Sequence, residues 1–167
     1  SGTAHTVTEK IHTLSAQSRA GAGAPEVGVA GAVAINIVTS KTEAFLAAGA
    51  NLNANASNVT LTAVNTVAVT AIATSKSEDG SKTGIGLSFA LNIAPITTRA
   101  EVEDNFVLTG GRDLALAATT TPTIITRAAA GAGGDSFSLG GAVALAIGDT
   151  RTTARIGTLT GSTSLTG

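Results

Sequence analysis

The chain has 167 residues, a net charge of −1 at neutral pH, 43% apolar residues and 13% charged residues. This share of apolar side chains excludes an intrinsically disordered chain, and the near-zero charge excludes the strongly basic surface of a typical nucleic-acid binder. Four Phe are the aromatic residues, and Cys is absent, which excludes disulfide bonds and thiolate metal sites. The chain relies on Ala, Gly, Val, Thr and Leu, so we expect a core of small side chains.

The first predicted strand includes residues 14–16, and residues 20–26 form a glycine-rich turn after it. Residues 28–37 then alternate large apolar side chains with Gly, Ala and Asn, a period of two that is typical of a β-strand. The apolar run at residues 27–38 is about 12 residues long and includes Asn36, whereas a membrane span needs about 20 residues. We therefore predict no insertion into a membrane.

A third strand is predicted at residues 42–46, and after it the pattern starts again. Residues 85–93 and 139–147 repeat residues 29–37 at offsets of 56 and 54, and both copies of the third strand follow them in the same order. The repeat is therefore about 55 residues long. The predicted units are residues 1–57, 58–111 and 112–163, with a further copy beginning at 164–167. Because both ends fall inside the pattern, we expect the chain to be a segment of a longer protein.

The repeated strands predict an all-β solenoid, similar to a parallel β-helix, built from about three copies of the 55-residue repeat. A helical interpretation of the Ala-rich stretches fails because Gly31, Gly140 and Gly141 interrupt them. A β-sandwich is the main alternative, although it does not require a repeat of this regularity. The pattern leaves open the handedness and whether one repeat forms one large coil or two smaller ones.

The large apolar side chains of residues 29–37 and of both later copies share one face of the strand. Stacking in register would place Val33, Phe89 and Val143 in one column, and we predict that this column lies in the interior. The opposite face carries small residues such as Ala32 and Ala90. Such a face indicates a second packed layer or close self-association, and packing within the chain is the preferred interpretation.

Charged residues alternate along the third strand and its copies. The repeat places Glu43 at the same position as Arg99, and Glu101 at the same position as Arg155. Opposite charges on neighbouring strands stabilise a register. We therefore predict two ion pairs, Glu43 with Arg99 and Glu101 with Arg155.

Two blocks of residues carry a resemblance to a known class of repeats. They are residues 28–37, which include Gly28, Ala32-Val33-Ala34 and Asn36, and residues 42–46, which include Thr42, Ala44 and Leu46. With their two looser copies they resemble the repeats of large bacterial surface proteins, namely filamentous-haemagglutinin-like adhesins and leukotoxin-type exoproteins. The resemblance implies a secreted, elongated β-helical stalk and supplies no catalytic residues. Ala146 replaces the Asn found at positions 36 and 92, so an Asn ladder would be incomplete.

Three groups of polar residues have side chains that could bind a metal ion, but each has a simpler interpretation. His5 and His12 have Glu9 between them but no further ligand nearby, and the acidic stretch Glu101, Glu103, Asp104 and Asn105 has the oxygen atoms that calcium prefers. Residues 131–137 weakly resemble a calcium-binding nonapeptide. The plainer interpretations are a surface segment near the N-terminus and solvated turns. We predict no catalytic, cofactor-binding or metal-binding residues, and we leave open a weak calcium site near Glu101, Glu103 and Asp104.

The predicted function is that of a structural stalk or spacer in a giant secreted or cell-surface bacterial adhesin, without catalysis. One alternative is an ice- or surface-binding solenoid, suggested by Thr-x-Thr pieces at residues 6–8, 60–62 and 158–160. A polysaccharide-acting β-helix is less favoured, because Asp113, Asp135 and Asp149 are isolated. The predicted partners are neighbouring repeats of the same chain and, through open ends, other copies of it. No nucleic acid is expected, and the surface ligand stays unidentified.

Overall fold

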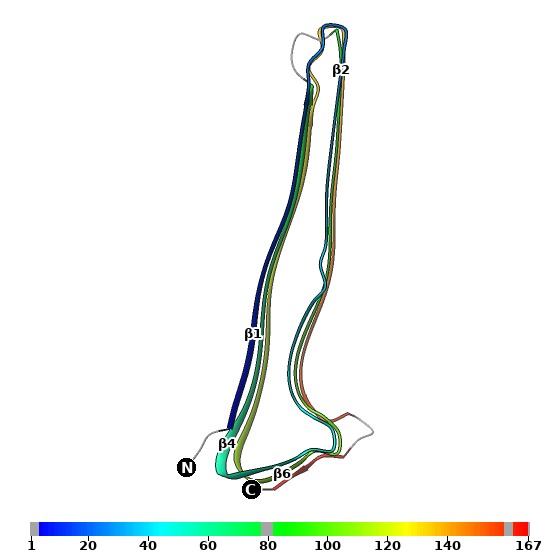
Figure 1. Ribbon diagram of the computed structural model, residues 1–167. Coiled ribbons are helices and arrows are strands. Elements are labelled where there is room, and N and C mark those ends of the chain that lie inside the picture. The colour runs from blue at the N-terminus through cyan, green and yellow to red at the C-terminus, as the bar shows by residue number, and fades with distance from the viewer. Residues whose placement is uncertain (1–3, 78–81, 159–161, 167) are drawn as a thin grey trace.

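The computed structural model describes residues 4–77, 82–158 and 162–166, and every regular element in these residues is a β-strand (Figure 1). The strands are β1 (Ala4–Ala22), β2 (Val27–Ile37), β3 (Ser40–Leu46), β4 (Asn51–Ser77), β5 (Thr83–Val102), β6 (Val107–Gly131), β7 (Phe137–Ile156) and β8 (Ser164–Leu165). The part of the chain that the structure describes has no helix capable of spanning a membrane. The predicted all-β class is confirmed.

The strands form two parallel sheets that face each other (Figure 1). The first sheet has the order β1-β4-β6-β8; in the second sheet, β2 and β3 pair with one edge of β5 and β7 pairs with the other. The register follows the sequence repeat, since Val33 lies beside Phe89 and Phe89 lies beside Val143. Each repeat therefore runs once along the first sheet and once back along the second.

The distance between the sheets changes along the strands because the interior side chains change in size (Figure 1). At the narrow end the buried apolar residues are alanines, including Ala32, Ala73 and Ala90. At the wide end the core contains Leu61, Phe106 and their apolar neighbours. Since side chains fill the space between packed layers, small residues hold the sheets close at one end and larger residues hold them apart at the other.

Glycine is required where the backbone of β5 approaches the end of β6 and the turn that follows it. A Cβ atom on Gly86 would lie 2.2 Å from the carbonyl oxygen of Gly131, and one on Gly84 would lie 2.1 Å from that of Gly133. Real Cβ atoms do not approach a backbone oxygen so closely. These glycines therefore set the minimum separation of the sheets.

The prediction that the Val33, Phe89 and Val143 column lies in the interior is wrong. The column exists, but its side chains point away from the opposite sheet, and Val33 is 59% exposed. The interior is filled instead by the small residues of the other face, including Ala32 and Ala90. The reason is that the facing strands also present small residues, Ala71 and Ala73, so two small faces pack together closely. The preferred interpretation of the small face, packing within the chain, is confirmed.

Polar side chains cross the interior and join the sheets. Asn36 donates a hydrogen bond to the backbone oxygen of Thr70 at 2.6 Å, and Asn92 donates one to that of Ile125 at 2.7 Å. Asn36 and Asn92 are neighbours in the register, whereas the next position is Ala146. The Asn ladder is thus incomplete in the predicted way. Nearer the wide end, the hydroxyl of Thr120 lies 2.6 Å from that of Thr98 across the interior.

We predict that Gly86→Ala lowers the free energy of unfolding by about 3 kcal/mol, because overpacking against backbone cannot be relieved by a side-chain rotation. Gly21→Ala is the matched control. Gly21 is exposed in β1, and a Cβ atom added to it would meet only the backbone oxygen of Lys76, at an ordinary contact distance of 4.0 Å, so the change should cost nothing and can stabilise the strand. Denaturant unfolding of both variants measures the difference. Equal stability would show that the sheets do not approach as closely as described.

Candidate functional site

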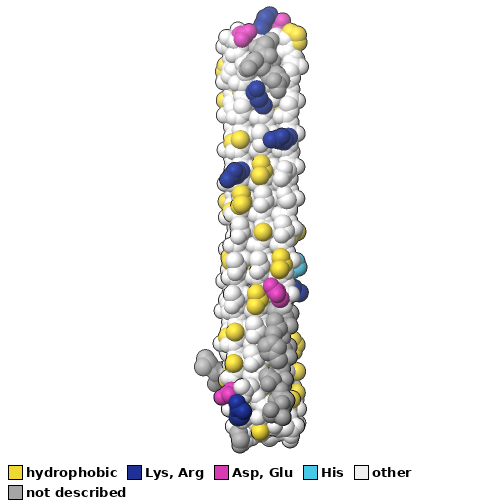
Figure 2. All heavy atoms as spheres, turned by 90° about the vertical axis from the view of Figure 1, so that its left-hand side faces the viewer, with side chains coloured by type: hydrophobic (Ala, Val, Ile, Leu, Met, Phe, Trp, Pro, Cys, Tyr) yellow, Lys and Arg dark blue, Asp and Glu magenta, His cyan; other side chains and the backbone are white. Residues whose placement is uncertain are grey.

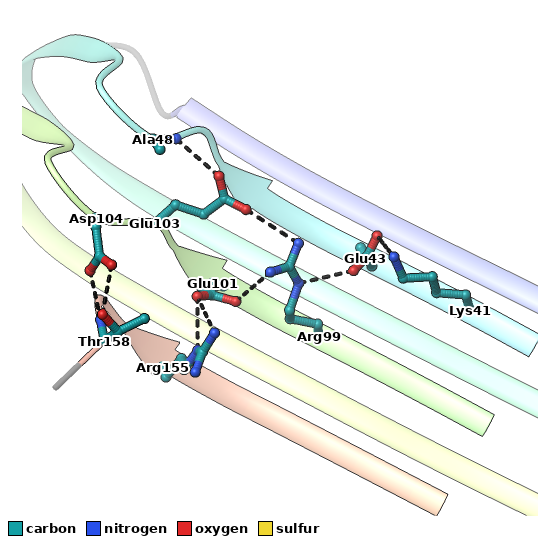
Figure 3. Close-up of polar contacts among 9 residues, drawn as sticks. All are labelled: Lys41, Glu43, Ala48, Arg99, Glu101, Glu103, Asp104, Arg155 and Thr158. Carbon is teal, nitrogen blue, oxygen red and sulfur yellow. Dashed lines mark hydrogen bonds and ion pairs between the residues drawn. The ribbon is translucent and has the colours of Figure 1, made fainter. Parts of the chain in front are cut away.

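The densest group of charged residues lies on the outer side of the second sheet, near the wide end (Figure 3). We call it the charge cluster. Its six members are Lys41, Glu43, Arg99, Glu101, Glu103 and Arg155. Three cations and three anions balance one another, and they come from β3, β5 and β7 and from the turn that follows β5.

Arg99 is the centre of the charge cluster. Its guanidinium group contacts Glu101 at 2.7 Å and Glu103 at 3.3 Å. Its Nε lies 2.9 Å from Glu43 Oε1, but without the alignment of a hydrogen bond, so this contact is an ion pair only. The guanidinium carbon also lies 5.4 Å from the centre of the Phe45 ring, within the range of a cation–π contact. Arg99 therefore joins three carboxylates from two strands and a turn.

Glu101 is buried, with 2% of its side chain exposed, although it belongs to the outer side of the sheet. One carboxylate oxygen accepts a hydrogen bond from Nε of Arg155 at 2.8 Å and forms an ion pair with Nη2 of the same residue at 2.7 Å. The other accepts one from Nη1 of Arg99 at 2.7 Å. The two ion pairs predicted from the repeat are therefore confirmed. The sequence did not indicate that Arg99 joins both pairs into one network.

The surroundings shift the pKa of three groups. Partial burial raises the pKa of Glu43, but the hydrogen bond from Lys41 and the charge of Arg99 outweigh it and hold the pKa below its usual value. Partial burial lowers the pKa of Arg99, but Glu43 and Glu101 together raise it more, so Arg99 stays charged. Hydrogen bonds from the hydroxyl and backbone of Thr158 lower the pKa of Asp104. These shifts all favour the charged forms.

The acidic stretch considered for calcium has other partners. Glu101 and Glu103 bind Arg99, and a Glu103 oxygen also accepts a hydrogen bond from the backbone nitrogen of Ala48 at 3.0 Å. Asp104 accepts hydrogen bonds from Thr158 at 2.7 Å and 2.6 Å (Figure 3). Within the described ranges, no group of three or more His, Asp or Glu side chains is arranged to hold a metal ion.

The other residues considered as sites do not come together. His12 is half-buried in the middle of β1, and the side chain of His5 lies outside the described residues. Asp149 contacts Arg151 at 3.4 Å on the exposed strand β7. Asp113 lies in β6 near the wide end, and Asp135 lies in the turn between β6 and β7 at the opposite end. These three aspartates, all within the described part of the chain, therefore form no pair of acidic groups for hydrolysis of a polysaccharide.

A second feature is an apolar surface on the outer side of the second sheet, which we call the apolar outer face. It consists of Val27, Val29, Gly31, Val33, Ile35 and Ile37 of β2, Thr83, Ile85, Leu87, Phe89, Leu91 and Ile93 of β5, and Phe137, Leu139, Gly141, Val143, Leu145 and Ile147 of β7. Many of these side chains are half exposed or more, up to 71% for Ile37. Seventeen of the eighteen positions are apolar or glycine, and none is charged. An apolar surface of this extent is typical of an interaction surface.

The outer side of the first sheet has a different character (Figure 2). Hydrophobic side chains are scattered on it, and charged side chains occur along its length. Thr66 lies beside Thr121, but Thr60 and Thr62 lie beside Ala115 and Ala117. The described Thr-x-Thr residues therefore do not stack into a regular array. Thr160 and the side chains of residues 6–8 lie outside the described residues.

The comparisons with known proteins give no relative. Neither a protein family model, nor a curated protein, nor a solved structure matches this chain. Functional inference therefore depends on the two surfaces described above.

We predict that Glu101→Gln lowers the free energy of unfolding by about 2 kcal/mol, because it weakens charge-assisted hydrogen bonds to two arginines at a buried position. The matched control is Glu26→Gln, which removes an exposed ion pair with Lys82 at 2.8 Å and should cost less than about 0.5 kcal/mol. Denaturant unfolding compares the two. A cost for Glu101→Gln no greater than that of the control would contradict the structural role of the charge cluster.

We also predict that the protein loses stability in acid. The pKa values of Glu43 and Asp104 are lower in the folded chain than in the unfolded chain. Their contribution is therefore complete above the unfolded values of about 4 and is lost as the pH falls through the folded values. Melting temperature measured against pH should fall in that range. The decline should be smaller in the double variant Glu43→Gln, Asp104→Asn, and an equal decline would assign the acid sensitivity to other groups.

Proposed function

We propose that this chain is a structural segment of a β-solenoid that serves as a spacer in a large secreted or cell-surface bacterial adhesin, without catalysis. The observation that carries the proposal is the parallel register between repeats. Residues about 55 positions apart lie side by side in both sheets, from β1 to β4 to β6 and from β2 to β5 to β7. Since each repeat pairs with the next by the same rule, the arrangement can be extended by adding repeats.

The interactions between repeats support a mechanical role. The backbone ladders run through strands of up to 27 residues, and ion pairs join the same positions of successive repeats, Glu43 with Arg99 and Glu101 with Arg155. Each of these contacts links one repeat to its neighbour. The stability of such an array grows with the number of repeats, which suits a spacer.

The dimensions of the repeat favour a broad spacer over a thin one. Strands of 20 to 27 residues are about 65 to 90 Å long, whereas each added repeat extends the stack by only about 4.8 Å. An array would therefore form a wide slab with two large outer faces. A spacer of this form separates the parts of the protein that it joins, and its two outer faces are also large enough to bind other molecules.

Solution scattering of tandem arrays tests the proposal. Arrays with twice and three times the present number of repeats should keep the cross-section of this chain and grow along the stacking axis by about 4.8 Å per repeat. Displayed on a bacterial surface, longer arrays should carry a terminal epitope farther from the membrane. Arrays that scatter as separate units joined by flexible links would contradict the proposal, and a flexible Gly-Ser chain of equal length is the control for the display experiment.

A further inference from the structure

The apolar outer face has the composition of an interface centre with polar ends. The exposed ion pair Glu26–Lys82 borders one end of it, and the charge cluster borders the other. Its eighteen positions carry no charge, whereas the first sheet has charged side chains along its outer side (Figure 2). Protein interfaces are depleted of charge at their centre and polar at their rim. We infer that the apolar outer face binds the same face of a second copy of this chain.

The charge distribution is compatible with a second copy and disfavours a strongly charged partner. The apolar outer face is uncharged, the charge cluster has equal numbers of cations and anions, and the whole chain has a net charge of −1. A copy of the same surface therefore meets little electrostatic repulsion. Nothing in this pattern selects a strongly charged partner, because complementarity to such a partner needs a surface potential of the opposite sign.

The relief of the face is complementary to itself. Counted along the strands, the third row is Gly31, Leu87 and Gly141, and the fourth row is Val33, Phe89 and Val143. These two rows line a shallow depression of about 440 Å³, and the space above Gly31 is open. Consider a twofold axis that lies between these two rows and runs perpendicular to the strands. It places the third row of one copy over the fourth row of the other copy. The valines then lie over the glycines, and Leu87 meets Phe89 of the other copy.

The area of the face requires this centred overlap. The face is eleven residues long and three strands wide, or about 36 Å by 14 Å. Complete overlap of two copies buries about 1,000 Å² in total, which is close to the minimum for a specific interface. A shifted arrangement would fall below that minimum. The centred axis therefore predicts antiparallel strands in two sheets about 10 Å apart.

Sedimentation of the full chain tests the inference. We expect a dimer that dissociates on dilution. Leu87→Lys and Val33→Lys replace side chains that are 53% and 59% exposed, so the fold should tolerate them, while a buried unpaired charge should raise the dissociation constant about a hundredfold or more. The control Thr121→Lys changes an exposed position on the first sheet and should leave the dimer intact. Circular dichroism and melting confirm that each variant is folded.

Cross-linking tests the geometry in a chain that has no native Cys. Leu87→Cys lies next to the proposed axis and should be joined to its copy by a short bismaleimide, whereas Thr121→Cys should not. A wild-type chain that is monomeric at all concentrations would overturn the inference, and binding of that monomer to neutral phospholipid vesicles would assign the face to lipid. Association that persists in both lysine variants would also overturn it and would assign the contact to strand edges.

Discussion

The close approach of the two sheets is the constraint on which the rest of the structure depends. At the narrow end, the carbonyl oxygen of Gly131 lies 2.2 Å from where a Cβ atom of Gly86 would be, and that of Gly133 lies 2.1 Å from where a Cβ atom of Gly84 would be. Such contact leaves room for little more than alanine between the layers, and Ala32, Ala73 and Ala90 occupy that room. Dispersion contacts between closely packed layers stabilise the fold, so many small side chains do here what a few large ones do in an ordinary core.

This constraint has a direct consequence for the surface. A strand has two faces, and the small face of β2 and β5 is buried inside. The small face of β7 points the same way by register, although β7 is the outermost strand of the sheet and is exposed. The large apolar residues of the same strands must then point outward, which produces the apolar outer face. Its exposure is therefore linked to the packing of the interior. A protein that exposes so much apolar area commonly covers it by association, and self-association through this face is the inference that the geometry supports.

The wide end is organised by different interactions. Larger side chains such as Leu61 and Phe106 separate the sheets there, and the charge cluster lies on the outer side of the same region. Glu101 is shielded by Arg99 and Arg155, which contact it from β5 and β7. Because removing one member of a buried ionic network leaves its partners uncompensated, the cluster fixes which residues of successive repeats lie side by side. Backbone hydrogen bonds alone specify the register of the strands less strongly, since a strand that is shifted along its neighbour still forms them.

The sequence by itself determined the strand character of residues 28–37 and 42–46 and of their copies, the repeat and the pairing of repeats. A period of two identifies a strand, and similarity at offsets of 54 to 56 identifies the residues that pair, as Val33 with Phe89 and Glu43 with Arg99 show. Only the tertiary structure decided which face of each strand is buried, that one repeat makes one passage along each sheet, and that Arg99 joins two ion pairs. The physical reason is that a period of two separates two faces without ranking them. The ranking depends on the opposite strand, where Ala71 and Ala73 lie about 40 residues along the chain from Ala32 and make the small face the buried one.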